Sequence, residues 1–163
     1  MKRFFPYFQK DGVKGITILE IIVVVGILLI LTTVSVSNLS SYRSRQILNG
    51  ESSQILSILN KARYQTLASK AQTSYGVRIE SDRVTLYTGP TFASVPGEYE
   101  EYVLNPSVSI TNISLNGGSA DVLFERLTGE TVSYGTFQVT LLSEVLQNHI
   151  IEISQTGFVG IQE

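Results

Sequence analysis

Residues 14–31 read KGITILEIIVVVGILLIL, and this stretch decides how the rest of the chain is interpreted. From Ile16 the run continues to Val36, and its single charged residue is Glu20. As an α-helix this run would span roughly 31 Å, about the thickness of the hydrocarbon core of a bilayer. Because an isolated segment in lipid must satisfy its own backbone hydrogen bonds, we predict a transmembrane helix over residues 16–36.

A basic segment precedes the apolar run. In residues 1–15 one acid stands against four basic residues, which are Lys2, Arg3, Lys10 and Lys14. Positively charged flanks of a membrane helix stay on the cytoplasmic side. We therefore expect the chain after Val36 to lie outside the cytoplasm.

A simpler reading of the same segment stays open at this point. Residues 1–37 would then be a secretory signal peptide or a plain signal anchor, with Ser35-Val36-Ser37 as a cleavage site. The rest of the chain would be an envelope β-domain of unknown binding function. The apolar run is longer than a typical signal peptide needs. A charge at the centre of a bilayer costs about 2.5–3.5 kcal/mol, so we expect Glu20 to pair with another group.

The composition excludes several classes of protein. The 163 residues allow one compact domain and an anchor, and the formal charge of −2 leaves no general basic surface for nucleic acid. No cysteine is present, which excludes disulfides, thiolate nucleophiles and zinc ribbons. Hydrophobic residues make up 43% and charged residues 16%, values typical of a folded chain.

After residue 37 the apolar pattern becomes one-sided. Leu48, Ile55, Leu59 and Ala62 recur at helical spacing, and no proline lies between Phe8 and Gly89. We predict one helix from about residue 16 to about residue 71, in which residues 37–73 form an amphipathic second half. This half continues into a globular head.

Residues 74–163 are expected to form that head, and their pattern is typical of strands. Apolar residues alternate with polar ones at 77–79 and 84–86, which predicts a hairpin. Residues 89–101 hold two prolines and two glycines and are interpreted as a loop. Further strands are predicted at 108–115, 120–127, 137–142, 149–154 and 158–161. The fold class is therefore α+β, a long N-terminal helix packed on an antiparallel β-sheet or β-sandwich.

No constellation of residues predicts an enzyme, a metal site or a cofactor. His149 is the single histidine and is interpreted as a strand-end residue, although Glu144 and Glu152 are near in sequence. The acids Glu98, Glu100 and Glu101 are interpreted as a solvated patch of the loop. Basic residues are absent after Arg126, and without residues 1–15 eight Lys and Arg face 13 Asp and Glu. This balance argues against DNA binding by the head.

The order of residues around Glu20 resembles the prepilin motif. Lys14-Gly15 is followed by four uncharged residues, then Glu20, then the apolar run. This is the processing signal of type IV pilins and of the pseudopilins of type II secretion. The resemblance covers residues 9–40, and it departs from the family at Ile16, where phenylalanine is usual.

The resemblance implies a maturation pathway and a set of partners. Prepilin peptidase would cut after Gly15, making residues 1–15 a leader peptide, and would methylate the new amine of Ile16. Glu20 of an incoming subunit would then meet the Ile16 ammonium of a neighbour, which sets the register of a filament. The implied partners are other pilin subunits, an inner-membrane platform protein, an assembly ATPase and membrane lipid.

The head resembles the H-type minor pseudopilins and related minor pilins more loosely. The similarity lies in Ala62-Arg63, in the segment from Phe124 to Gly129 and in the segment from Ile153 to Val159. It implies a low-copy subunit near the tip of the filament. The chain lacks the disulfide common in major pilins, and Asp121 is the single aspartate late in the chain, which argues against a calcium loop.

Overall fold

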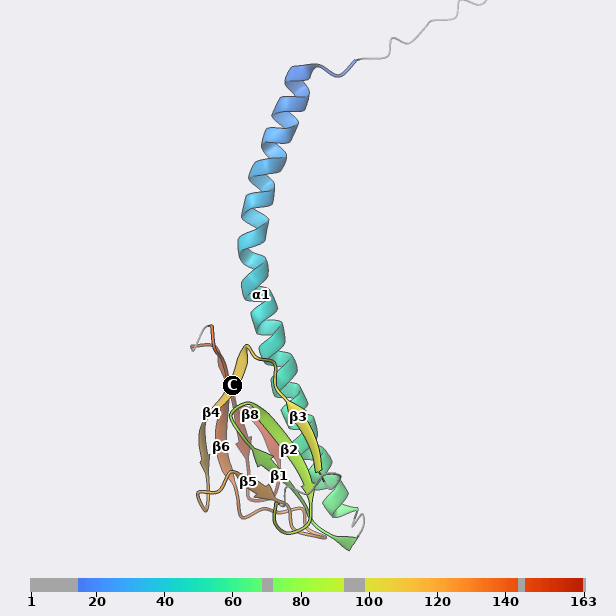
Figure 1. Cartoon of the computed structure of the whole chain (residues 1–163), viewed down its shortest axis with the longest axis vertical. Coiled ribbons are helices and arrows are strands. Elements are labelled where there is room, and N and C mark those ends of the chain that lie inside the picture. The colour runs from blue at the N-terminus through green and yellow to red at the C-terminus, as the bar shows by residue number, and fades with distance from the viewer. Residues whose placement is uncertain (1–14, 69–71, 93–98, 144–145, 163) are drawn as a thin grey trace, which may run out of the picture. The chain divides into compact units, whose positions relative to one another are not determined.

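The computed structural model describes residues 15–68, 72–92, 99–143 and 146–162, without the side chains of residues 33–41. The chain consists of two compact units, Met1–Ser40 and Ser41–Glu163. Helix α1, Ile18–Leu67, begins in the first unit and ends in the second. The strands all belong to the second unit (Figure 1).

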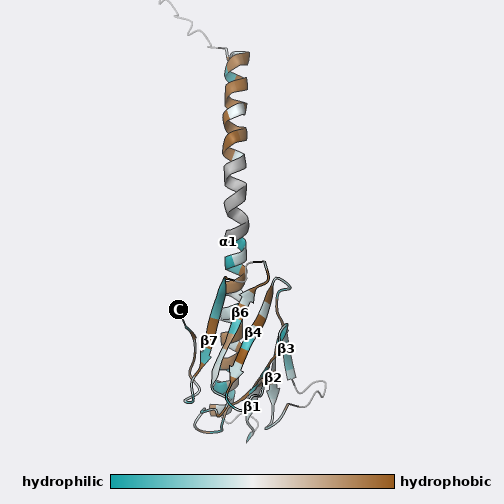
Figure 2. Cartoon of the chain, turned by 90° about the vertical axis from the view of Figure 1, so that its left-hand side faces the viewer, coloured by the Kyte–Doolittle hydropathy of each residue, from teal (hydrophilic) through white to brown (hydrophobic). Residues whose placement is uncertain are grey.

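The first unit presents apolar side chains on every side of α1. From Ile18 to Leu31 the large aliphatic residues are all exposed, with exposed fractions from 49% to 80%. In Figure 2 the ribbon of this part of α1 is coloured mostly brown, for hydrophobic residues. Among the described residues, no helix meets the length and hydropathy requirements of a membrane span. The transmembrane helix expected at residues 16–36 stays a prediction.

The second unit contains two antiparallel sheets of four strands each. The first has the order β3-β2-β1-β5 and the second the order β4-β6-β7-β8. The strands of the first sheet are β1 (Tyr75–Ile79), β2 (Arg83–Thr88), β3 (Tyr99–Val103) and β5 (Asp121–Leu123). Those of the second are β4 (Val108–Leu115), β6 (Gly135–Leu141), β7 (Asn148–Ile153) and β8 (Val159–Gln162).

One hydrophobic core joins α1 to the inner faces of both sheets. Ile55, Leu59 and Ala62 of α1 are fully buried, and they share the core with Val77 of β1 and Phe137 of β6. The inward side chains alternate along the strands, as they must when one face of a sheet is buried. The α+β fold class is thereby confirmed, and the buried face of α1 has the helical spacing expected from the sequence, although α1 ends at Leu67 rather than near residue 71.

Two predictions for the head need correction. The segment 89–101 is not wholly loop, because β3 begins at Tyr99 and pairs along β2. The strand predicted at 120–127 ends at Leu123, and the chain then turns: the Gly129 N–H donates to the Glu125 carbonyl oxygen, and Leu127 has a positive φ of 71°. Both differences lie at the edges of the first sheet, where short and charged strands are common.

Phe124 and Phe137 are the largest fully buried side chains of this core among the described residues. We expect Phe124→Ala to lower the free energy of unfolding by about 3–5 kcal/mol, because the ring leaves a cavity that the two sheets cannot close. Guanidinium unfolding followed by circular dichroism measures the change. Phe158→Ala is the matched control, since Phe158 is exposed; an equal loss in both variants would contradict the placement of the core.

Candidate functional site

The residues of the predicted processing site lie at the start of α1. Gly15, Ile16 and Thr17 are not helical, and α1 begins at Ile18. The Glu20 backbone N–H donates a hydrogen bond to the Thr17 hydroxyl at 3.3 Å, so Thr17 caps the helix. Glu20 lies in the first helical turn, where its negative charge interacts favourably with the positive end of the helix dipole.

The Gly15–Ile16 peptide bond lies in an exposed, non-helical segment. A Cβ atom added to Gly15 would meet no described atom within 4 Å, so the fold itself does not demand glycine there. Ile16 and Glu20 are both exposed. The predicted leader residues Lys2, Arg3, Lys10 and Lys14 lie outside the described residues.

In the second unit, Arg63 near the end of α1 contacts two loops that are distant in sequence. Its Nε donates to the carbonyl oxygen of Gly129 at 3.3 Å, and its Nη2 donates to the carbonyl oxygen of Thr156 at 3.2 Å. The guanidinium fork can hold two acceptors in a fixed geometry. Arg63 thus ties the end of α1 to two loops, residues 124–134 and residues 154–158.

The same two loops also touch through their glycines. A Cβ on Gly157 would lie 1.9 Å from the Gly129 carbonyl oxygen and 2.9 Å from Arg63 Nε. The φ angles of Gly129 and Gly157 are 68° and 75°, a region that glycine adopts without strain. The Thr131 N–H also donates to the Gln155 carbonyl oxygen at 3.0 Å. These contacts make the two loops one rigid surface at the end of the sheets.

Leu127 is an exception within this rigid surface. Its φ of 71° places a branched side chain in the left-handed region, at a cost of about 1–2 kcal/mol. The tight turn around it is closed by the Gly129 N–H, which donates to the Glu125 carbonyl oxygen at 2.9 Å. The Leu127 side chain is nevertheless 78% exposed. Strain at an exposed apolar residue points to a contact outside the isolated chain.

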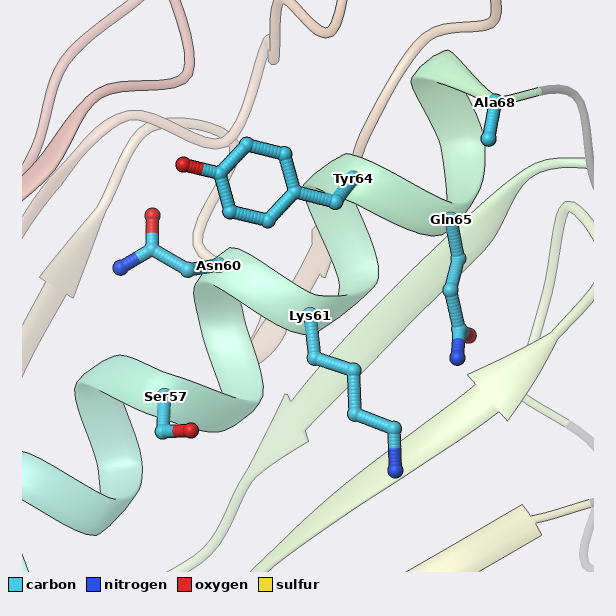
Figure 3. Close-up of a pocket in the computed structure, with 6 residues that line it drawn as sticks. All are labelled: Ser57, Asn60, Lys61, Tyr64, Gln65 and Ala68. Atoms are coloured by element: carbon cyan, nitrogen blue, oxygen red, sulfur yellow. The ribbon is translucent and has the colours of Figure 1, made fainter.

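One cavity runs along the outer face of α1. It has a volume of about 640 Å³ and is lined by Ser57, Asn60, Lys61, Tyr64, Gln65 and Ala68 (Figure 3). The single charged residue of this lining, Lys61, forms an ion pair with Glu100 of β3 at 2.5 Å. The lining therefore offers no pair of free ionisable groups for acid–base chemistry.

The first sheet carries a mixed aromatic and ionic cluster on its outer face. The Arg78 guanidinium lies 4.7 Å from the Phe92 ring centroid, and Arg78 Nη1 lies 3.6 Å from Asp121 Oδ1. Burial, and next the negative charge of Asp121, raise the pKa of Tyr87 to about 12. Tyr87 is therefore a neutral phenol at physiological pH, which suits packing rather than proton transfer.

Glu100, Glu101 and His149 have structural partners, and Glu144 lies outside the described residues. Glu101 pairs with Arg83, and Glu100 with Lys61, so these acids belong to β3 rather than to a loop; Glu98 lies outside the described residues. His149 Nδ1 lies 3.1 Å from the Ser52 hydroxyl and links β7 to α1. Within the described part of the chain, no group of three His, Cys, Asp or Glu could hold a metal ion.

Two solved structures with a similar fold are crystal forms of the type IV minor pilin FimU of Pseudomonas aeruginosa strain PAO1. The TM-scores are 0.53 and 0.56 at 12% sequence identity. The matches cover 71% and 75% of this chain and 93% and 92% of the FimU chains. No family model and no curated protein sequence matches the chain. At this identity the likeness shows a shared fold, a long helix packed on antiparallel sheets.

We expect Arg63→Ala to loosen both loops at once, because each loses a hydrogen bond from a charged donor, worth about 1.5–3 kcal/mol. Hydrogen exchange of amides in residues 124–134 and 154–158 should quicken together. Arg63→Lys should rescue this only in part, since an ammonium lacks the planar fork. Arg126→Ala is the control, as Arg126 is exposed; faster exchange in one loop alone would contradict the shared anchor.

Proposed function

We propose that this chain is a structural subunit of a pilus-like filament, a minor pseudopilin of type II secretion or a minor type IV pilin. The observation that carries the proposal is the coincidence of two independent features. The fold is that of a minor pilin, and the order of residues from Gly15 to Glu20 stands at the start of its long helix. Each feature alone is weaker, because a fold is compatible with many functions.

Cleavage after Gly15 would convert the start of α1 into an assembly site. The new ammonium of Ile16 would lie two residues before the helix, and methylation would leave its charge in place. In a filament of parallel helices, Glu20 of one subunit would neutralise the ammonium of another. An unpaired carboxylate in a low-dielectric interior is costly, so this pairing would favour one axial register.

The exposed apolar surface from Ile18 to Leu31 supports the same proposal. A helix that is hydrophobic on all sides needs a surrounding that is hydrophobic on all sides. We assign residues 16–36 to the bacterial inner membrane before assembly and to the helical core of the filament afterwards. The head would lie outside the cytoplasm. Prepilin peptidase, a platform protein and an assembly ATPase are the partners that this pathway requires.

The Glu20 carboxylate is open to a direct test. We expect Glu20→Ala to leave membrane insertion intact and to reduce recovery of the subunit in sheared filaments at least tenfold, because the register-setting charge is lost. Thr17→Val is the matched control, since it removes the helix cap and keeps the carboxylate. Equal recovery of Glu20→Ala and the unaltered chain in sheared filaments would show that Glu20 has no role in assembly. Equal loss in both variants would assign Glu20 to helix capping.

The glycine before the cleavage site gives a second test. We expect Gly15→Ala to accumulate unprocessed protein, seen as slower mobility on a gel, because the peptidase of this family prefers glycine there. The fold has room for the added methyl group, so the effect would arise at the peptidase. Gly26→Ala is the control, since its Cβ also meets no described atom within 4 Å. Normal mobility of the Gly15→Ala product would count against the processing site.

A further inference from the structure

The head carries exposed apolar residues at two opposite ends of its sheets. The loop patch consists of Leu127 and Phe158, which are 78% and 66% exposed and lie on the two loops that Arg63 joins. The cavity patch consists of Val103 and Leu142, each 60% exposed.

Strand register places the two patches at opposite ends. The loop patch lies beyond the Gly135 end of β6, where Gly135 pairs with Ile153. The cavity patch lies beyond the other end of β6, where Leu141 pairs with Val108. Figure 1 shows the connections at these two ends of β6 and β7 well separated within the second unit.

The cavity patch encloses space that a side chain could fill. Val103 and Leu142 line a cavity of about 340 Å³ together with Pro106 and Val108. Its lining also includes Leu104 and, at its polar side, Ser81, Asp82, Asn105 and Ser109. The volume is large enough for a leucine side chain against the aliphatic residues, since about 150 Å³ already holds a benzene ring. Filling it would remove the two exposed aliphatic residues from water.

Leu127 has the properties of a contact residue that could fill this cavity. A residue with a positive φ is normally glycine or asparagine, and an exposed leucine there contributes little to its own fold. The turn from Glu125 to Glu130 nevertheless holds it outward through two backbone hydrogen bonds of 2.8 and 2.9 Å. Leu127 is therefore presented on a rigid support, as a contact residue in an interface needs to be.

Charges beside the two patches are complementary. Asp82 lines the cavity, and three carboxylates, those of Glu80, Asp82 and Glu101, share the Arg83 guanidinium. Its hydrogen bond to Arg83 holds the pKa of Asp82 below its usual value, so Asp82 is ionised at neutral pH. Arg126 precedes Leu127, is exposed, and forms no ion pair with any residue that the structure describes.

We propose that Leu127 of one copy of this chain docks in the cavity between Val103 and Leu142 of a second copy. The contact joins different surfaces of two identical subunits, and such a contact repeats along a line when subunits are parallel. It rests on the proposed function only for that parallel arrangement. It adds to Glu20 a second register-setting contact, in the heads, and requires that at least two copies follow one another in the filament.

The absence of cysteine from the sequence allows a clean cross-linking test. Two tagged copies of the full chain, Leu127→Cys and Leu142→Cys, are expressed together in the filament-forming host, and a short bis-maleimide is added to sheared filaments. We expect a covalent dimer carrying both tags, and none when either variant is expressed alone. Ile113→Cys with Leu142→Cys is the matched control, because Ile113 is exposed on β4 outside both patches.

Each other outcome overturns the contact. A dimer from Leu127→Cys alone would mean that like surfaces meet. Filaments that contain both variants but yield no mixed dimer would overturn the head contact and leave the filament function standing. If the unaltered chain enters no filament and the mixed dimer is absent, both proposals fall.

A second variant separates assembly from folding. We expect Leu127→Asn to melt at or above the temperature of the unaltered chain, because asparagine tolerates a positive φ better than leucine does. A copy that carries Phe158→Cys should cross-link to a Leu142→Cys copy. Adding Leu127→Asn to the Phe158→Cys copy should lower the yield of this mixed dimer at least fivefold. A lower melting temperature with an undiminished cross-link would show that Leu127 serves the fold and not the contact.

Discussion

The burial of one face of α1 against two sheets is the interaction on which the second unit depends. Ile55 and Leu59 are fully buried, and each such side chain contributes about 1.5–3 kcal/mol relative to an exposed one. The same face holds the end of α1 against the sheets, since Ala62 is buried there. The next residue, Arg63, is thereby placed within hydrogen-bond distance of the carbonyl oxygens of Gly129 and Thr156. The loop that presents Leu127 is positioned by that same reach.

The two parts of α1 meet different physical demands within one continuous helix. In the second unit a single face is apolar and buried, whereas from Ile18 to Leu31 the apolar side chains point in all directions and remain exposed. The first arrangement is complete within one chain. The second leaves large aliphatic side chains exposed in the isolated chain, and the proposed assembly through parallel helices would cover them.

The sequence was most informative where periodicity was strong. The helical spacing of Leu48, Ile55 and Leu59 predicted the buried face of α1, and two-residue alternation predicted β1 and β2. β3 was missed because Glu100 and Glu101 stand side by side in it, and on an edge strand both are balanced by cations from other elements, Lys61 and Arg83. The sequence of β3 therefore shows no alternation of apolar and polar residues from which a strand could be predicted.

The junction at Arg63 could not be derived from spacing, because its partners lie 66 and 93 residues away in the sequence. A resemblance drew attention to the same three segments, but their contact emerged only from the folded arrangement of α1 and the loops. The positive φ of Leu127 could not be predicted from the sequence either. Such a φ is usually signalled by glycine or asparagine, and this position holds leucine.

The mature N-terminus is best determined from the intact mass of the membrane-extracted protein from its own host. We expect the mass of a chain that lacks residues 1–15, begins at Ile16 and carries one additional methyl group. The mass of a chain that begins at Met1 or at Asn38 would rule out the proposed processing. The protein would then be an anchored or secreted β-domain, and Glu20 would have no assembly partner to explain it.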